Sequence, residues 1–228
     1  MVSQPIIFLG FRTEVAFLFS LSKTLYKIKR FGNSLFTYNC ISCGKAVRGG
    51  CLCENCSKEL VPTGRYFNGF ACAFYYEGPA KETVLRFKFG TDYAFCFDTL
   101  CDWLLLGYEK LEDRDFDAVI PVPAFETKST RLSELTKKFS LLADIPFRPD
   151  YLKKIRKTEK QHKLSVSERR LNLAGAFEAS DDVLGKTVLL VDDIFTTGST
   201  VTECASALYD KGAEKVCVLT VLKTRYHS

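Results

Sequence analysis

The sequence predicts an α/β protein with a parallel sheet flanked by helices, and three observations lead to this fold class. The 228 residues are 46% hydrophobic and 26% charged, a globular composition that excludes disordered and fibrous chains. Strand-like and helix-like segments alternate over residues 116–228, which implies crossover connections between parallel strands. Residues 188–191 are apolar without alternation, as in a strand that is buried on both faces.

The first 115 residues are expected to divide into three sections: a helical lead-in at 1–37, a cysteine-rich section at 38–60 and a mainly helical section at 61–115. Residues 5–21 are rich in apolar side chains but include Arg12 and Glu14, and they lack the basic start and cleavage site of a signal peptide. We interpret this segment as an amphipathic helix that packs on the body. A helix that binds a membrane or a partner is the alternative.

The remaining elements follow from apolar periodicity and from turn residues. Strands are expected at 71–76, 116–122, 151–155, 186–191 and 215–222, which predicts a sheet of about five strands. Helices are expected at 80–89, 94–110, 127–143, 167–173 and 199–211, and Gly212 closes the last of them.

The cysteines indicate a reducing compartment, so we expect a cytoplasmic protein. Five of the ten fall between residues 40 and 56, and the others stand singly, mostly among apolar neighbours. This distribution is typical of buried thiols plus one metal cluster, and it differs from a disulfide framework.

Two cysteine pairs predict a structural zinc site. Cys40-x2-Cys43 and Cys53-x2-Cys56 are separated by nine residues, and each pair supplies two thiolates from one turn. Four protein ligands leave no open position on the metal. Cys51 is a rival for Cys53, but only Cys53 has the two-residue gap to Cys56. A redox dithiol and unliganded buried cysteines are the alternatives.

The stretch from 188 to 200 predicts a site for a phosphorylated sugar. Its apolar strand leads to Asp192 and Asp193, and the residues Thr196, Thr197, Gly198, Ser199 and Thr200 then turn into a helix. Backbone N–H groups at a helix N-terminus bind phosphate, and the hydroxyl groups add donors. Carboxylates repel phosphate but suit sugar hydroxyls. A ribose with free 2′- and 3′-hydroxyls and a 5′-phosphate satisfies both halves.

Three other interpretations of this stretch are weaker. A Walker A loop would need glycine where Ser180 stands, and Gly185-Lys186-Thr187 precedes its strand instead of following it. A receiver domain would need far more than the 35 residues that follow Asp193. The third interpretation is that the two aspartates merely end a strand.

Residues 188–200 resemble the motif that binds 5-phosphoribosyl 1-pyrophosphate (PRPP) in type I phosphoribosyltransferases. Further motifs stand in the order seen in the ComF family, and the resemblance covers roughly residues 38–222. They are the two cysteine pairs, Tyr76-Glu77-Gly78-Pro79, Leu85-x2-Lys88-Phe89, Pro121-Val122-Pro123, Gln161 with Leu164, Arg170-x-Asn172 and Ala176-Phe177. ComF proteins are linked to DNA uptake in bacterial competence, and they combine a zinc ribbon with a phosphoribosyltransferase-like domain.

This resemblance implies a zinc ribbon at 38–60 and a type I phosphoribosyltransferase-like domain at 61–228, with a hood at 61–115 and a core at 116–228. It also implies PRPP-dependent transfer with Mg²⁺, a glycosyltransferase reaction whose acceptor and catalytic residue are unassigned. The implied PRPP-binding residues are Asp192, Asp193, Thr196, Thr197, Gly198, Ser199 and Thr200.

One departure favours a second hypothesis. The family's Arg-Gly-Phe-Asn-Gln segment after the Pro-Val-Pro motif is missing, so only Lys128 and Arg131 remain there to hold pyrophosphate. The alternative function is therefore a non-catalytic accessory factor in DNA uptake that binds single-stranded DNA or a helicase.

The net charge of +5 is concentrated in residues 148–170, which hold nine basic and three acidic residues. Three interpretations of residues 153–170 stay open. In the first, these residues are a loop that covers pyrophosphate through Lys157, Lys160 and Lys163. In the second they contact nucleic acid, and in the third they are a solvated loop. We interpret His162 as part of this polar segment without a role as a base.

Overall fold

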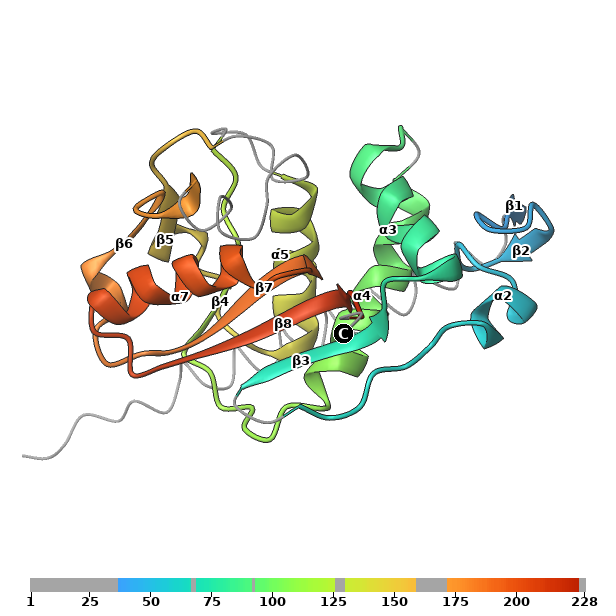
Figure 1. Ribbon diagram of the computed structural model, residues 1–228. Coiled ribbons are helices and arrows are strands. Elements are labelled where there is room, and N and C mark those ends of the chain that lie inside the picture. The colour runs from blue at the N-terminus through green and yellow to red at the C-terminus, as the bar shows by residue number, and fades with distance from the viewer. Residues whose placement is uncertain (1–36, 67–68, 92, 126–129, 159–171, 226–228) are drawn as a thin grey trace, which may run out of the picture.

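The computed structural model describes residues 37–66, 69–91, 93–125, 130–158 and 172–225, and a four-stranded parallel sheet lies at its centre (Figure 1). The strands are β3 (Phe70–Tyr75), β4 (Ala118–Pro121), β7 (Thr187–Phe195) and β8 (Lys215–Lys223), in the spatial order β3-β8-β7-β4. All neighbours in this sheet pair in parallel, as the alternation of strands and helices predicts.

Apolar side chains fill both faces of the sheet. Along β7, Leu189 and Val191 join one core, while Val188 and Leu190 join the other. Helix α7 (Ser199–Asp210) covers the second core, and α4 (Ala94–Tyr108) and α5 (Arg131–Ala143) cover the first (Figure 1). Helix α3 (Gly78–Phe89) packs beside α4. Burial on both faces explains the unbroken apolar run in the sequence.

The expected strand at 151–155 forms, but it does not join the central sheet. Strand β5 (Leu152–Lys154) pairs antiparallel with β6 (Phe177–Ala179), which the sequence patterns missed. In β5 only Leu152 is fully buried, so the segment is too polar for a central parallel strand. Among the described residues the central sheet therefore has four strands, where about five were expected.

Residues 61–115, expected as a hood, also extend the central sheet. Their strand β3 lies at its edge and pairs with β8, which follows it by most of the chain. Helices α3 and α4 of the same section supply much of the core beneath. This section is thus part of the sheet as well as of the helical layer.

The cysteine-rich section forms a small ribbon at the other end of the molecule from β6 (Figure 1). Strands β1 (Thr37–Asn39) and β2 (Ala46–Arg48) pair antiparallel, and the short helix α2 (Glu54–Lys58) follows. Ile41 and Leu52 pack against the main core and so attach the ribbon to the body.

Several expected bounds shift. Helix α5 begins at Arg131 because Thr130 caps it, its side chain accepting from the Ser133 N–H. The expected lead-in at 1–37 lies outside the described residues except for Thr37, and so does the helix at 167–173 except for its last two residues.

Among the described residues, no helix is long and apolar enough to span a membrane.

Candidate functional site

A cavity of about 500 Å³ opens at the carboxyl ends of β4 and β7. It exists because β4 ends at Pro121, opposite Val191, while β7 continues to Phe195. The expected end of this strand at residue 191 was therefore too early, and both aspartates lie within β7. The cavity is lined by Lys88, Val122, Pro123, Ala124, Thr130, Leu132, Asp192, Asp193, Ile194, Thr196 and Thr200. Ligands of open α/β sheets bind at this edge.

The two carboxylates have different surroundings. Side chains alternate along a strand, so Asp192 and Asp193 leave β7 on opposite faces. The Asp193 carboxylate pairs with Lys88 of α3, and the Asp193 N–H donates to Asp192 Oδ1 over 2.8 Å. Burial and the neighbouring Asp193 charge raise the pKa of Asp192 to about 7, although Lys88 acts in the opposite direction.

The turn at 196–198 presents the N-terminus of α7 to this cavity. Gly198 precedes the helix with a φ of 78°, and a Cβ there would lie 2.7 Å from Phe195 Cζ, so only glycine fits. The hydroxyl oxygens of Thr197 and Ser199 are 2.9 Å apart. No acidic residue stands in the first turn of α7. The backbone N–H groups and the helix dipole therefore suit an anion.

The structure brings the PRPP-binding residues predicted from the sequence into one place. Asp192, Asp193, Thr196 and Thr200 line the cavity. Thr197, Gly198 and Ser199 form the turn and the start of α7 beside it.

The basic residues expected at pyrophosphate lie elsewhere or are not described. Arg131 donates to the Phe87 carbonyl over 2.6 Å and stacks 4.1 Å from the centre of the Tyr93 ring. This places its guanidinium against α3, and Arg131 is not among the lining residues. Lys157 is exposed. Lys128, Lys160 and Lys163 lie outside the described residues.

Lys88 is the site residue to which sequence reasoning gave no role. It lies in the last turn of α3, and its Nζ is 2.8 Å from Asp193 Oδ2. The signal was its place in the Leu85-x2-Lys88-Phe89 motif, but nothing local in the sequence links that motif to β7.

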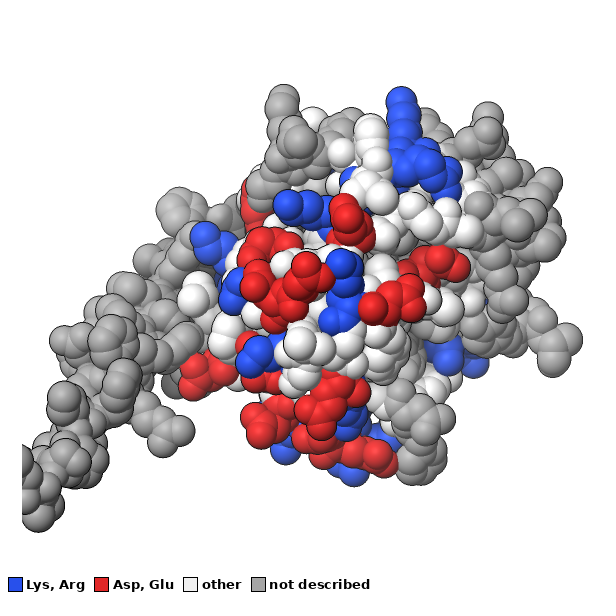
Figure 2. Space-filling model, turned by 90° about the vertical axis from the view of Figure 1, so that its left-hand side faces the viewer, with Lys and Arg blue, Asp and Glu red and all other residues white. Residues whose placement is uncertain are grey.

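The described part of the basic segment is largely engaged within the protein. Arg148 pairs with Asp150, and Arg156 donates to the carbonyls of Asn172 and Ala174. Figure 2 shows acidic and basic side chains interspersed over the described surface at the β6 end of the molecule. That surface shows no continuous basic patch of the kind that nucleic acid requires.

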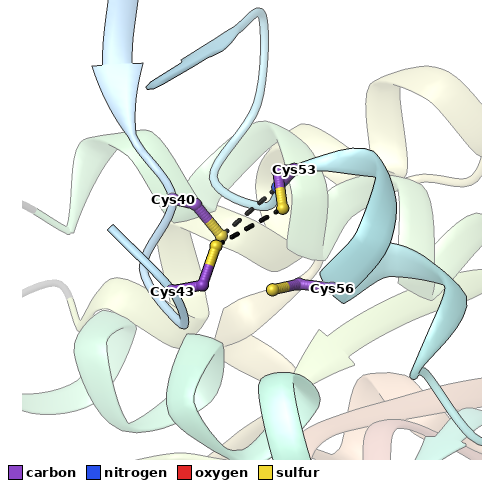
Figure 3. A group of neighbouring side chains, drawn as sticks. All are labelled: Cys40, Cys43, Cys53 and Cys56. Atoms are coloured by element: carbon purple, nitrogen blue, oxygen red, sulfur yellow. Dashed lines mark hydrogen bonds between the residues drawn. The ribbon is translucent and has the colours of Figure 1, made fainter. Parts of the chain in front are cut away.

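The four predicted metal ligands converge (Figure 3). The sulfur atoms of Cys40, Cys43, Cys53 and Cys56 all lie within 4.8 Å of one another. Thiolates bound tetrahedrally to one zinc ion lie about 3.8 Å apart, so this donor set fits zinc. Burial raises the pKa of Cys40, but hydrogen bonds within the ribbon outweigh it and lower the pKa to about 6, whereas burial raises the pKa of Cys56 to about 12. The protein alone thus favours the thiolate at Cys40 and the thiol at Cys56, and the fit to zinc depends on the convergence of the four sulfur atoms.

Cys51, the rival ligand, lies apart from this cluster. It is buried, and hydrogen bonding to the Cys96 side chain lowers its pKa. Cys96 belongs to α4, so Cys51 points into the junction between the ribbon and the body. The geometry therefore favours Cys53 as the ligand.

Comparison with known proteins gives a consistent result. Residues 130–226 match the family model described as phosphoribosyl transferase domain. The chain is 28% identical over 202 residues to competence protein F of Haemophilus influenzae, which covers 78% of this chain and 87% of that protein. It is 25% identical over 206 residues to competence protein ComFC of Bacillus subtilis, covering 89% and 85%. DNA utilization protein YhgH of Escherichia coli O157:H7 is 34% identical over 113 residues, which are 47% of this chain and half of that protein.

Proposed function

Because the chain belongs to the ComF family of competence proteins with a phosphoribosyltransferase-like domain, we propose that its cavity at β7 and α7 binds PRPP, or a related ribose 5-phosphate ligand, together with Mg²⁺. One observation carries this proposal. The turn before α7, whose N–H groups suit an anion, and the carboxylates of Asp192 and Asp193 border the same cavity of about 500 Å³. This volume suits a small-molecule ligand such as PRPP.

Each part of the site has a role in this proposal. The first N–H groups of α7 and the hydroxyls of Thr196 and Thr200 donate to the 5′-phosphate, and so does the hydroxyl that accepts in the Thr197–Ser199 hydrogen bond. Asp192 and Asp193 accept hydrogen bonds from the ribose hydroxyls. Lys88 holds the Asp193 carboxylate in place through the ion pair. Bound Mg²⁺ would supply positive charge that stabilises the pyrophosphate group.

We further propose that the site transfers the phosphoribosyl group. The bond between C1′ of the ribose and the pyrophosphate oxygen breaks, pyrophosphate leaves with the electron pair, and a nucleophilic acceptor bonds to C1′. Fixed positive charge near the leaving pyrophosphate would stabilise this step. The free thiols among the described residues suit the reducing cytoplasm, where we place the protein.

Calorimetric titration with PRPP and Mg²⁺ tests the binding proposal. We expect a dissociation constant of about a millimolar or tighter, and we expect the double variant Asp192→Asn/Asp193→Asn to lose binding, since amides lack the charge that strengthens hydrogen bonds to the hydroxyls. The matched control is Asp181→Asn/Asp182→Asn, another adjacent acidic pair, which lies in the exposed helix η3 (Asp181–Val183) away from the cavity. Undiminished binding by the first double variant would refute the ribose assignment.

A second function, an accessory factor in DNA uptake that binds single-stranded DNA or a helicase, is supported by two observations. The Arg-Gly-Phe-Asn segment is missing, and Arg131 is engaged with α3 instead of the cavity. The relative named for DNA utilization is consistent with it.

Limited trypsin digestion of residues 153–170 separates the two functions. Protection by PRPP and Mg²⁺ supports the transferase. Protection by single-stranded DNA that fades steeply with salt supports the accessory factor, because phosphate contacts release counterions. If neither ligand changes the cleavage, residues 153–170 take part in neither of the two functions.

A further inference from the structure

A second cavity, of about 470 Å³, lies between the ribbon and the helical layer, and we call it the ribbon–helix cavity. It is lined by Tyr38, Gly49 and Gly50 of the ribbon, by residues 93–95, Phe97 and Asp98 at the start of α4, and by Glu134 and Lys138 of α5. None of these residues lines the cavity at β7. The two cavities are therefore separate sites.

Aromatic rings make up much of the wall. The Tyr38 and Phe95 rings pack on each other with their centres 4.3 Å apart and their planes tilted by 53°, and the centres of Tyr93 and Phe97 are 6.5 Å apart. Phe95 is 39% exposed, which is high for a phenylalanine in a packed helical layer. Gly49 and Gly50 add no side chains to the ribbon wall. Flat apolar rings beside open space suit a planar aromatic ligand.

The charged groups in this cavity include one carboxylate in an ion pair and one without a charged partner among the described residues. Lys138 forms an ion pair with Asp98 and lies 5.6 Å from the centre of the Phe97 ring. The charges of Lys138 and Asp98 are therefore engaged with each other. Glu134 is exposed, and no ion pair or side-chain hydrogen bond engages its carboxylate among the residues that the structure describes. Glu134 can therefore accept hydrogen bonds from a ligand.

An adjoining cavity of about 460 Å³ extends the first. It shares Tyr38, Gly50 and Phe95 with the ribbon–helix cavity and adds Arg86 of α3. A ligand with a planar ring on Phe95 therefore has room to extend into this second cavity.

We propose that the ribbon–helix cavity binds a nucleobase, stacked on the exposed ring of Phe95 with its N–H donors toward Glu134. One carboxylate accepts from two adjacent donors at once, and guanine presents a ring N–H beside an exocyclic amino group. The site therefore prefers guanine. The base belongs either to a free nucleotide or to single-stranded nucleic acid, because both present the same ring and donors. This inference does not depend on PRPP binding at β7.

Ligand-observed saturation-transfer NMR with guanosine and inosine on the full chain tests the proposal. Inosine lacks only the exocyclic amino group, so guanosine should bind several-fold more tightly. Phe95→Ala should weaken guanosine binding about tenfold through lost stacking. Glu134→Gln, a change at an exposed position, should abolish the preference for guanosine over inosine. Leu106→Ala is the matched control, since Leu106 is 46% exposed on the same helix outside the cavity, and it should bind as the wild type does.

Three results would overturn the proposal: no saturation transfer to guanosine, binding unchanged in both Phe95→Ala and Glu134→Gln, or guanosine binding lost in Asp192→Asn/Asp193→Asn. The last result would place the base in the cavity at β7. Retained guanosine binding by that double variant separates this site from the PRPP site, so either proposal can fail alone.

A further arm identifies the source of the base. A short thymidine oligomer with one central deoxyguanosine is compared with guanosine at low and high salt. Tighter, salt-sensitive binding of the oligomer assigns the site to single-stranded nucleic acid. Equal binding assigns it to a free nucleoside or nucleotide. Both results require the base site, so Phe95→Ala should weaken the binding of guanosine and of the oligomer.

Discussion

Lys88 Nζ and Asp193 Oδ2 lie 2.8 Å apart and join the last turn of α3 to the strand that carries the candidate site. Their side chains are 31% and 15% exposed, so water screens this pair less than a surface pair. The pair brings one cation to a place where two adjacent carboxylates would otherwise repel each other. It also links the helical section at 61–115 directly to β7.

Replacement of Lys88 by Met should raise the pKa of Asp192 above about 7, because the Lys88 charge lowers it. Carboxyl NMR titration measures this change. Lys81→Met is the control, since Lys81 is exposed on the same helix and does not line the cavity. If the pKa of Asp192 is equal in the wild type and in Lys88→Met, the ion pair does not act on Asp192.

Asp192→Asn should stabilise the fold at alkaline pH. The pKa of Asp192 is raised from an ordinary value near 4 to about 7 in the folded state, so folding favours the protonated acid. Its unfavourable contribution is absent below about pH 4, grows between the two values and is complete above about pH 7. Since the shift is about three pH units, urea unfolding should show a gain of at most about 4 kcal/mol at about pH 8 and of about 1 kcal/mol at about pH 5.

Asp193→Asn is the comparison for that experiment. It removes the partner of Lys88 and should not stabilise the protein as Asp192→Asn does. A gain for Asp192→Asn that does not change with pH would show that ionisation of Asp192 is not its cause.

The ribbon should hold about one equivalent of zinc, because its four sulfur atoms fit one tetrahedral ion. Cys53→Ser removes one of the converging thiols and should lose the metal. Cys51→Ser should keep it, since Cys51 faces Cys96 instead of the cluster. Metal analysis of the purified variants measures the content, and zinc lost from Cys51→Ser but kept by Cys53→Ser would reverse the ligand assignment.

Gly198→Ala should destabilise the protein more than Gly185→Ala. Both glycines have positive φ, 78° and 67°, so alanine at either costs about 1 kcal/mol in backbone strain. Only at position 198 would the new Cβ meet an atom within 4 Å, the Phe195 ring, which packs against Phe70. Urea unfolding gives both costs, and Gly198→Ala should also weaken PRPP binding. Equal costs would mean that the Phe195 ring moves aside freely.

Local patterns in the sequence were sufficient for the features that depend on local structure. The apolar run at 188–191 predicted a buried parallel strand because both of its faces are covered by helices. The turn from Asp192 to Thr200 is contiguous in the chain, so its geometry follows from a strand end and a helix start. The two cysteine pairs are likewise close in sequence, which made their convergence predictable.

Features that join distant segments were beyond those patterns. Lys88 reaches Asp193 only because α3 packs near the end of β7, and no periodicity encodes that contact. Similarly, the sequence allows the side chain of Arg131 to turn to the cavity or to α3. It turns to α3 because the Phe87 carbonyl and the Tyr93 ring bind its guanidinium there. The pattern at 151–155 predicted a strand but could not specify its partner, which is β6.

The pairing of β3 with β8 has a consequence for biosynthesis. Among the described strands β8 leaves the ribosome last, yet it lies between β3 and β7 in the sheet. Until β8 is made, β3 has no neighbour in the sheet, and the apolar side chains of α4 that pack on β8 remain uncovered. The nascent chain must keep this surface from aggregating while about half of the sequence is synthesised, from the end of α4 to the start of β8. Loss of β8 alone would divide the sheet and leave β3 without a strand that connects it to β7 and β4.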